Sequence, residues 1–197
     1  MTAWKEINNI CVYCGSRTGH KADYEQAAIK LGHWIGEQGK TLVYGAGSIG
    51  LMGITARSVM EKGGDVIGII PEHLDKVEIT QQGMQETIIT QNMHERKKLM
   101  FEKSDAFIVL PGGLGSMDEF FEMLTWSQLR LHCKPIYLYN VDGYWSPLVD
   151  FIDHIIKEGF ADEGNKKLFT VIDSHDDLIK ALESGYDESF KSKNKFF

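Results

Sequence analysis

Residues 106–119 read AFIVLPGGLGSMDE, and this stretch decides the fold class. It runs from an apolar, β-branched segment through three glycines into a pattern of helical period. A buried strand, a tight turn and a helix in direct succession are typical of an α/β protein. The turn itself has two interpretations, either the entry to a well-capped helix or a backbone cradle for a phosphate.

Strand-like and helix-like segments alternate along the whole chain. The strand candidates are almost continuously hydrophobic, as strands buried on both faces should be. They are Ile10–Tyr13, Thr41–Tyr44, Val66–Ile70, Ala106–Leu110, Pro135–Tyr139 and Phe169–Ile172, and helices are expected at about 23–38, 50–62, 93–104, 116–131, 145–158 and 175–184. The pattern predicts an α/β fold with a doubly wound, mostly parallel, Rossmann-like sheet. We expect a single nucleotide-binding domain over residues 1–185, and a loose or partner-packed tail over 186–197.

Composition excludes several classes of protein. The 197 residues are 43 % hydrophobic and 25 % charged, which is ordinary for a soluble globular domain. A net charge of -7 argues against a broad nucleic-acid surface. No stretch has transmembrane length, and the first residues do not resemble a signal peptide. We therefore expect a cytoplasmic protein that binds neither nucleic acid nor a membrane.

The cysteine pattern does not predict a metal site. Cys11 and Cys14 have the spacing of a zinc or redox half-motif, but they lie in a strand-like run, and no second pair follows at metal spacing. With Cys133 the number of cysteines is odd, so they cannot all pair within the chain. We interpret Cys11 and Cys14 as buried strand residues.

The ligand site is expected beyond the carboxyl ends of the strands, where open α/β sheets bind their ligands. Glycine-rich segments follow three predicted strands, at 14–16, 45–50 and 111–116. Glycine lets backbone N–H groups approach a ligand closely, and the start of each following helix is electropositive. Three such loops at one edge predict a nucleotide or sugar-phosphate site.

Residues 45–50 match the dinucleotide fingerprint G-x-G-x-x-G, and Glu72 can be offered as the acid for the ribose. The match follows the second predicted strand instead of the first, and Glu72 lies past its strand, so a nicotinamide cofactor is disfavoured. We interpret Gly45 and Gly47 as phosphate or ribose contacts, and a plain turn is the alternative. No G-x-x-x-x-G-K-[ST] motif is present, which excludes a P-loop NTPase.

The segment Met93–Phe101 places two cations on the apolar side of a predicted helix. At about 100° per residue, Arg96 and Lys97 fall inside the arc of Met93, Leu99 and Met100, whereas Glu95 and Lys98 fall outside it. Buried cations need an anionic partner. The functional interpretation is a phosphate clamp, and the alternative is a pair of side chains with packed stems and solvated charges.

The stretch 116–119 fits the capping box S-x-x-E, with Ser116 as the N-cap of the helix. That pattern explains Ser116 and Glu119 but not the glycines of 111–115, which suit an anion-binding nest. We expect Ser116 to start the helix, the glycines to direct N–H groups at a phosphate, and Glu119 to face the sugar of the ligand.

Two motifs in this order carry a family resemblance. Residues 93–97 and 111–119 resemble the M-H-x-R-K and P-G-G-x-G-T-x-x-E motifs of the Lonely Guy family, cytokinin riboside 5′-monophosphate phosphoribohydrolases whose bacterial relatives are often mislabelled lysine decarboxylases. Matches at 14–16, 44–47, 50–53, 125–126, 128–129 and 134–135 extend the resemblance over most of the chain. Ala46 replaces a usual glycine, which adds a methyl group near the ligand, and Ser116 replaces a usual threonine.

The resemblance implies hydrolysis of the N-glycosidic bond of adenine-type (cytokinin or AMP) nucleoside 5′-monophosphates to free base and ribose 5-phosphate. It implies Arg96 and Glu119 as catalytic residues and needs no metal or organic cofactor. The expected substrate-binding residues are Gly45, Gly47, Glu78, Met93, Arg96, Lys97, Gly112, Gly113, Gly115, Ser116 and Glu119. A homodimer is expected, and the alternative function is a non-catalytic nucleotide or cofactor carrier or sensor. Lysine decarboxylation is disfavoured, because no motif places a Schiff-base lysine and its pyridinium partner.

Overall fold

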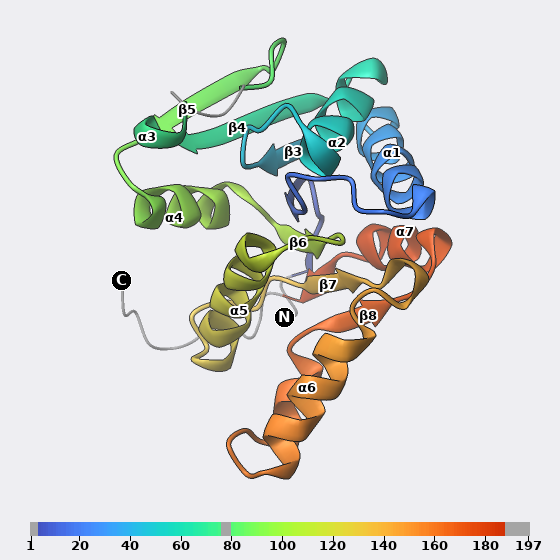
Figure 1. Ribbon diagram of the computed structural model, residues 1–197, viewed down its shortest axis with the longest axis vertical. Coiled ribbons are helices and arrows are strands. Elements are labelled where there is room, and N and C mark those ends of the chain that lie inside the picture. Colours follow the sequence, from blue (N-terminus) through green and yellow to red (C-terminus); the bar gives the residue numbers. More distant parts are fainter. Residues whose placement is uncertain (1–3, 76–79, 188–197) are drawn as a thin grey trace.

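The computed structural model describes residues 4–75 and 80–187 as an α/β domain built on a parallel sheet (Figure 1). The seven strands lie in the order β5-β4-β3-β2-β6-β7-β8, and every neighbouring pair is parallel. Their bounds are β2 (Asn9–Tyr13), β3 (Thr41–Tyr44), β4 (Asp65–Pro71), β5 (Glu86–Thr90), β6 (Ala106–Val109), β7 (Ile136–Tyr139) and β8 (Thr170–Ile172). A separate antiparallel pair joins β1 (Trp4–Lys5) to β9 (Tyr186–Asp187). The predicted fold class is confirmed.

Helices cover both faces of the sheet (Figure 1). One core cluster joins α1 (Ala22–Glu37), α2 (Gly50–Glu61) and α7 (His175–Glu183) to Ile10 and Val12 of β2. The other cluster joins α4 (Met93–Lys103), α5 (Leu114–Gln128) and α6 (Ser146–Lys157) to Cys11 and Tyr13. Successive β2 residues therefore pack on opposite faces, as strand geometry requires. The short elements are α3 (Glu72–Asp75), η1 (Val141–Gly143) and η2 (Glu163–Lys167).

The sequence pattern misses three strands. β5 is the edge strand of the large sheet, and Glu86 and Thr87 are exposed, so it lacks the continuous apolar character of a central strand. β1 and β9 have two residues each, too few to show a period. The predicted domain boundary after residue 185 falls immediately before β9, and the rest of the predicted tail, 188–197, lies outside the described residues.

The chain order creates a switch point at the centre of the sheet. β2 and β6 are neighbours, and the chain builds outward from β2 to β5 on one side and from β6 to β8 on the other. The connections from the ends of β2 and β6 therefore lead to opposite faces and leave a crevice between them. The loops at 14–21 and 110–113 border this crevice.

Cys11 is a buried residue of β2, as predicted, whereas Cys14 is buried but lies just beyond the end of the strand. Cys133 is half-buried, and none of the three cysteines forms a disulfide with another described residue. Burial raises the pKa of the Cys11 and Cys14 thiols well above the usual range, so neither is a reactive thiolate. Within 4–75 and 80–187, no helix has the length and apolar character needed to cross a membrane.

Candidate active site

Helix α5 begins earlier than the capping box predicts. Its N-cap is Gly113 and its first residue is Leu114, so Ser116 lies inside the first turn. The prediction that Ser116 caps the helix is wrong, because glycine is itself an acceptable N-cap and the helix begins three residues sooner. Met117 N–H donates to Gly113 C=O at 3.2 Å, which leaves the N–H groups of residues 114–116 without intrahelical partners.

Ser116 instead packs into the loop before the helix. It is 4 % exposed, and a Cβ on Gly112 would lie 2.1 Å from its Oγ, so only glycine fits at 112. A Cβ on Gly113 or Gly115 would meet no atom within 4 Å, so both glycines border open space. The first turn of α5 thus presents free N–H donors toward an unfilled region, which is the geometry that favours an anion.

Helix α4 carries the capping arrangement that the sequence pattern assigned to α5. The Asn92 side chain accepts from Glu95 N–H at 2.9 Å, and the Glu95 carboxylate accepts from Gln91 N–H at 2.7 Å. This fixes the first turn of α4 with Arg96 facing the sheet. Arg96 is 8 % exposed and the side chain of Lys97 is 11 % exposed, whereas Lys98 is exposed. The prediction that Arg96 and Lys97 point toward packed structure is confirmed.

Arg96 lies under the glycine loop that follows β3. Its Nη2 donates to Gly45 C=O at 3.4 Å, and its Nη1 donates to the sulfur of Met93 at 3.7 Å. A Cβ on Gly45 would lie 2.0 Å from Nη2, so glycine at 45 makes the space for the guanidinium. Nε is buried and has no hydrogen-bond partner among the described residues. A buried donor of this kind is available to a ligand.

Lys97 is held by carboxylates of α5. Its Nζ lies 3.2 Å from Asp118 Oδ2 and 3.1 Å from Glu122 Oε2. Burial lowers the pKa of Lys97, but hydrogen bonds and charges from Glu122 and Asp118 outweigh burial, so the pKa is raised overall. Lys97 therefore joins α4 to α5 as a paired cation.

Glu119 is the acid with the most perturbed titration near this edge. The pKa of Glu119 is raised to about 7, and burial is the main cause. The charge of Arg96 lowers this pKa, and the charge of Asp118 raises it. A carboxyl group that titrates near neutrality is suited to proton transfer. Arg96 from α4 and Glu119 from α5 thus come close enough to interact electrostatically.

The loop after β3 is more tightly packed than its fingerprint suggests. Gly45, Ala46 and Gly47 are all buried. Ala46 has a φ of 64°, which is unfavourable for a residue with a Cβ, and its methyl group lies against Gly68 of β4. The extra methyl group therefore packs into the core against β4. Glu72, offered for a ribose, begins α3, and Glu78 lies outside the described residues.

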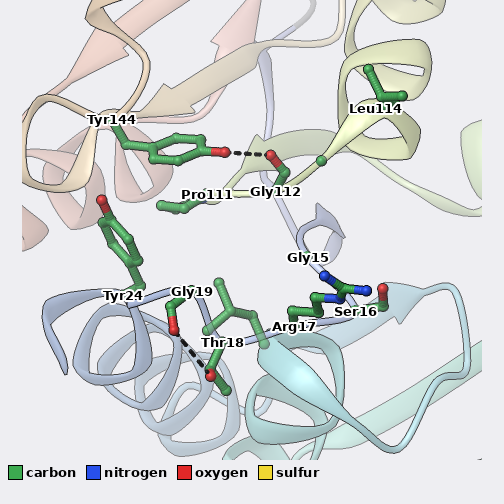
Figure 2. Close-up of a pocket in the computed structure, with 12 residues that line it drawn as sticks. Gly15, Ser16, Arg17, Thr18, Gly19, Tyr24, Pro111, Gly112, Leu114 and Tyr144 are labelled. Atoms are coloured by element: carbon green, nitrogen blue, oxygen red, sulfur yellow. Dashed lines mark hydrogen bonds between the residues drawn. The ribbon is translucent and has the colours of Figure 1, made fainter. Parts of the chain in front are cut away.

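A cavity of about 520 Å³ occupies the switch point beside the start of α5 (Figure 2). Gly112 lines it on one side, and Ser16 and Arg17 on the loop after β2 line the other. The Tyr144 hydroxyl donates to Gly112 C=O at 2.6 Å, and the Tyr144 and Tyr24 rings meet edge to face at 5.5 Å. The sequence analysis missed Arg17, Tyr24 and Tyr144, and only the position of Arg17 just after a glycine-rich strand end could have indicated one of them.

Known proteins resemble the chain in sequence and in fold. A family model described as "Possible lysine decarboxylase" matches residues 52–182. The cytokinin riboside 5'-monophosphate phosphoribohydrolase LOG of Oryza sativa subsp. japonica is 45 % identical over 177 residues, which is 90 % of this chain and 73 % of the relative. An Arabidopsis thaliana enzyme with the same activity in its name is 44 % identical over 177 residues, covering 90 % of this chain and 83 % of its own.

Solved structures with the same fold are more distant in sequence. A molybdenum cofactor binding protein from Rippkaea orientalis has a TM-score of 0.68 at 20 % identity, covering 91 % of this chain and 97 % of that one. A Moco carrier protein from Chlamydomonas reinhardtii has a TM-score of 0.68 at 21 % identity, covering 90 % and 96 %. Identities this low establish the shared fold only. The sequence relatives and the family model together show that the chain belongs to the LOG family, whose curated members are cytokinin riboside 5'-monophosphate phosphoribohydrolases.

Proposed function

We propose that the protein hydrolyses the N-glycosidic bond of adenine-type nucleoside 5′-monophosphates and releases the free base and ribose 5-phosphate. The observation that carries this proposal is the electrostatic interaction between buried Arg96 and Glu119, whose pKa of about 7 suits proton transfer. Glu119 belongs to α5, whose first-turn N–H groups are free to bind an anion. The sequence relatives carry this reaction in their names.

The reaction requires stabilisation of a positively charged sugar. The bond between C1′ and the base nitrogen breaks, its electron pair leaves with the base, and the ribose develops oxocarbenium character. The Glu119 carboxylate stabilises this charge and accepts a proton from the water whose oxygen bonds to C1′. That proton then passes to the departing base or to solvent. Arg96 contacts the ribose and the leaving base with its free Nε.

The remaining predicted residues hold the substrate. The N–H groups of the first turn of α5, with Gly112, Gly113, Gly115 and the hydroxyl of Ser116, bind the 5′-phosphate. Gly45 and Gly47 act by keeping Arg96 and the loop after β3 in place, and Met93 supports the guanidinium. We retain Glu78 as a ribose contact, as the family resemblance implies.

A Schiff-base mechanism, which a decarboxylase would need, is not supported at this site. Its lysine must reach the neutral form easily, which requires a lowered pKa. Lys97 has a raised pKa because Glu122 and Asp118 hold its ammonium group.

The test is to incubate the purified protein with AMP and with isopentenyladenosine monophosphate and to assay free base and ribose 5-phosphate. We expect both products in equal amounts, and a comparison of the two kcat/KM values identifies the preferred base. Tight binding without release of base would instead establish a carrier or sensor.

We further propose that the enzyme works as a homodimer in the cytoplasm. Apolar side chains near α5 and α6 support the dimer: Leu114 is 81 % exposed and Phe151 is 54 % exposed, and both line a shallow hollow of about 460 Å³. Light scattering coupled to size-exclusion chromatography tests it, and a mass near 22.3 kDa at all concentrations would contradict it.

A further inference from the structure

The phosphate subsite of the proposed reaction lacks the cation that the sequence pattern assigned to it. A phosphate monoester carries up to two negative charges, and sites for it combine backbone N–H groups with a cationic side chain. Lys97 was the predicted point charge, but two carboxylates already neutralise it. Arg96 is bonded to Gly45 C=O and is not among the residues that line the cavity at the switch point.

The cavity at the switch point contains a cation in a suitable position. Its lining residues include Ser16, Arg17, Gly112 and Gly113, and Arg17 is the one charged residue among the twelve described residues that line it. Arg17 is exposed and makes no ion pair with the described part of the chain. Lys21 is paired with Asp142, whereas Arg17 has no such partner among the residues that the structure describes. Figure 2 shows the Arg17 side chain beside Ser16, across the cavity from Gly112.

The loop that carries Arg17 is held in place on both sides. Gly15 N–H donates to Pro111 C=O at 3.0 Å, which ties it to the loop before α5, and Gly15 C=O accepts from Met52 N–H at 3.3 Å. Gly50 has a φ of 60°, and a Cβ there would lie 2.4 Å from Arg17 N, so α2 packs directly against the loop. The backbone of Arg17 is therefore positioned before any ligand binds, which favours affinity.

We propose that Arg17 is the phosphate-binding cation of this site and, with Ser16 and the first turn of α5, selects substrates with a 5′-phosphate. This inference rests on the proposed function for the identity of the substrate. The guanidinium fork matches two phosphate oxygens at once, and Ser16 supplies a hydroxyl donor. The absence of a carboxylate among the described lining residues makes the cavity locally positive in a protein of net charge -7.

Binding of ribose 5-phosphate, measured by titration calorimetry, tests the inference independently of catalysis. We expect Arg17→Gln to weaken the affinity by about 10- to 100-fold, the range for losing a charge-assisted hydrogen bond. Arg17→Lys should keep part of it. The matched control is Lys167→Gln, which removes an exposed cation beside β8 and should leave the affinity unchanged. A weaker dependence of binding on salt is also expected for Arg17→Gln.

Kinetics with AMP and adenosine supply the second readout. Arg17→Gln should raise the KM for AMP by the same factor, with kcat within about twofold, because Arg17 binds the phosphate in the ground state and in the transition state alike. Any activity with adenosine should not change. Equal affinities of Arg17→Gln and the unmodified protein for ribose 5-phosphate would overturn the inference, as would an unmodified protein that does not bind it. Binding that depends on Arg17 without release of base would refute the proposed function and leave the role of Arg17 standing.

Discussion

The proposed mechanism depends on the protonation state of Glu119. Burial raises the pKa of this carboxyl group and so favours its protonated form near neutrality, which cannot accept a proton. The charge of Arg96 lowers the pKa and favours the carboxylate. The resulting pKa of about 7 means that the carboxylate and the acid are both populated near neutral pH. A group in that range can accept a proton from water and return it within one turnover.

The first prediction concerns the pH dependence of catalysis. In the proposed mechanism Glu119 acts as the carboxylate, so kcat/KM for AMP should fall about tenfold per pH unit below its pKa of about 7 and level off above it. Glu119→Gln should lower kcat by about 10²- to 10⁴-fold and abolish this acid limb. Glu183→Gln, which changes an exposed acid at the end of α7, is the control. An acid limb that persists in Glu119→Gln would assign the titration to another group.

The second prediction concerns the space at Gly45. A Cβ at this position would lie 2.0 Å from Arg96 Nη2, the flexible end of a side chain, so the guanidinium moves and the fold survives. Gly45→Ala should therefore cost less than about 1.5 kcal/mol of unfolding free energy but reduce kcat/KM by about 10²-fold, because Arg96 is displaced. Gly164→Ala is the control, since a Cβ there meets nothing within 4 Å. Full activity of Gly45→Ala would show that the position of Arg96 is not critical.

At the scale of helices and loops, Ser116 has two predicted roles, as the N-cap of α5 and as a phosphate contact. Only the second is compatible with the position of Ser116 in the helix. The helix begins at Leu114, so Ser116 cannot contribute as an N-cap, whereas Asn92 caps α4 by accepting from Glu95 N–H at 2.9 Å. Asn92→Ala should thus destabilise the protein by about 1 kcal/mol, and Ser116→Ala by less than about 0.5 kcal/mol while weakening phosphate binding. Denaturant unfolding of the two variants checks this order. Equal losses would mean that Ser116 has a structural role as large as that of a cap.

The connection between β7 and α6 should control the glycine loop before α5. The Tyr144 hydroxyl binds Gly112 C=O at 2.6 Å, and the adjacent Trp145 donates through Nε1 to Val109 C=O at 3.2 Å. Tyr144→Phe should raise the KM for AMP by about three- to tenfold with kcat unchanged, because the loop loses one fixed hydrogen bond. Tyr137→Phe removes an equivalent bond to Ala181 C=O on the α7 side and should leave the KM unaltered. Similar KM values for the two variants would contradict a role for Tyr144 in positioning.

Strands that are buried on both faces could be predicted from the sequence. Features that depend on contacts between separate elements could not. Continuous hydrophobicity predicts the central strands. Helical period alone predicts that Arg96 and Lys97 point toward packed structure. The partner of Lys97 could not be predicted, because Asp118 and Glu122 belong to another helix and meet Lys97 only after packing. The start of α5 was misplaced because the residues S-x-x-E also occur inside a first turn. The pattern alone does not show whether the serine is the N-cap.

For the whole molecule, the sheet order explains why distant residues share one site. β2 and β6 are nearly one hundred residues apart in sequence yet pair directly, which brings the loops at 14–21 and 110–113 together. Alternation of strands and helices predicted this edge as the ligand site. It could not predict that the cavity lies between Arg17 and Gly112, because that detail depends on how the loops pack, as the contact of Gly50 with Arg17 shows.

The last prediction concerns the stability of the whole protein as a function of pH. The pKa of Glu119 is raised from 4.5 to about 7 in the folded state, so the folded protein holds the proton more tightly than the unfolded chain. The contribution of this group to stability is therefore fully present below about pH 4.5 and is lost as the pH rises to about 7.

Glu119→Gln removes that dependence, because glutamine stays neutral at every pH. The variant should match the unmodified protein in unfolding free energy near pH 4.5 and exceed it by about 2–3 kcal/mol at pH 8. Urea unfolding at a series of pH values measures the difference, with Glu183→Gln as the variant that should track the unmodified protein throughout. A variant that is less stable than the unmodified protein at pH 8 would show that Glu119 is not the half-buried, raised-pKa acid on which the mechanism depends.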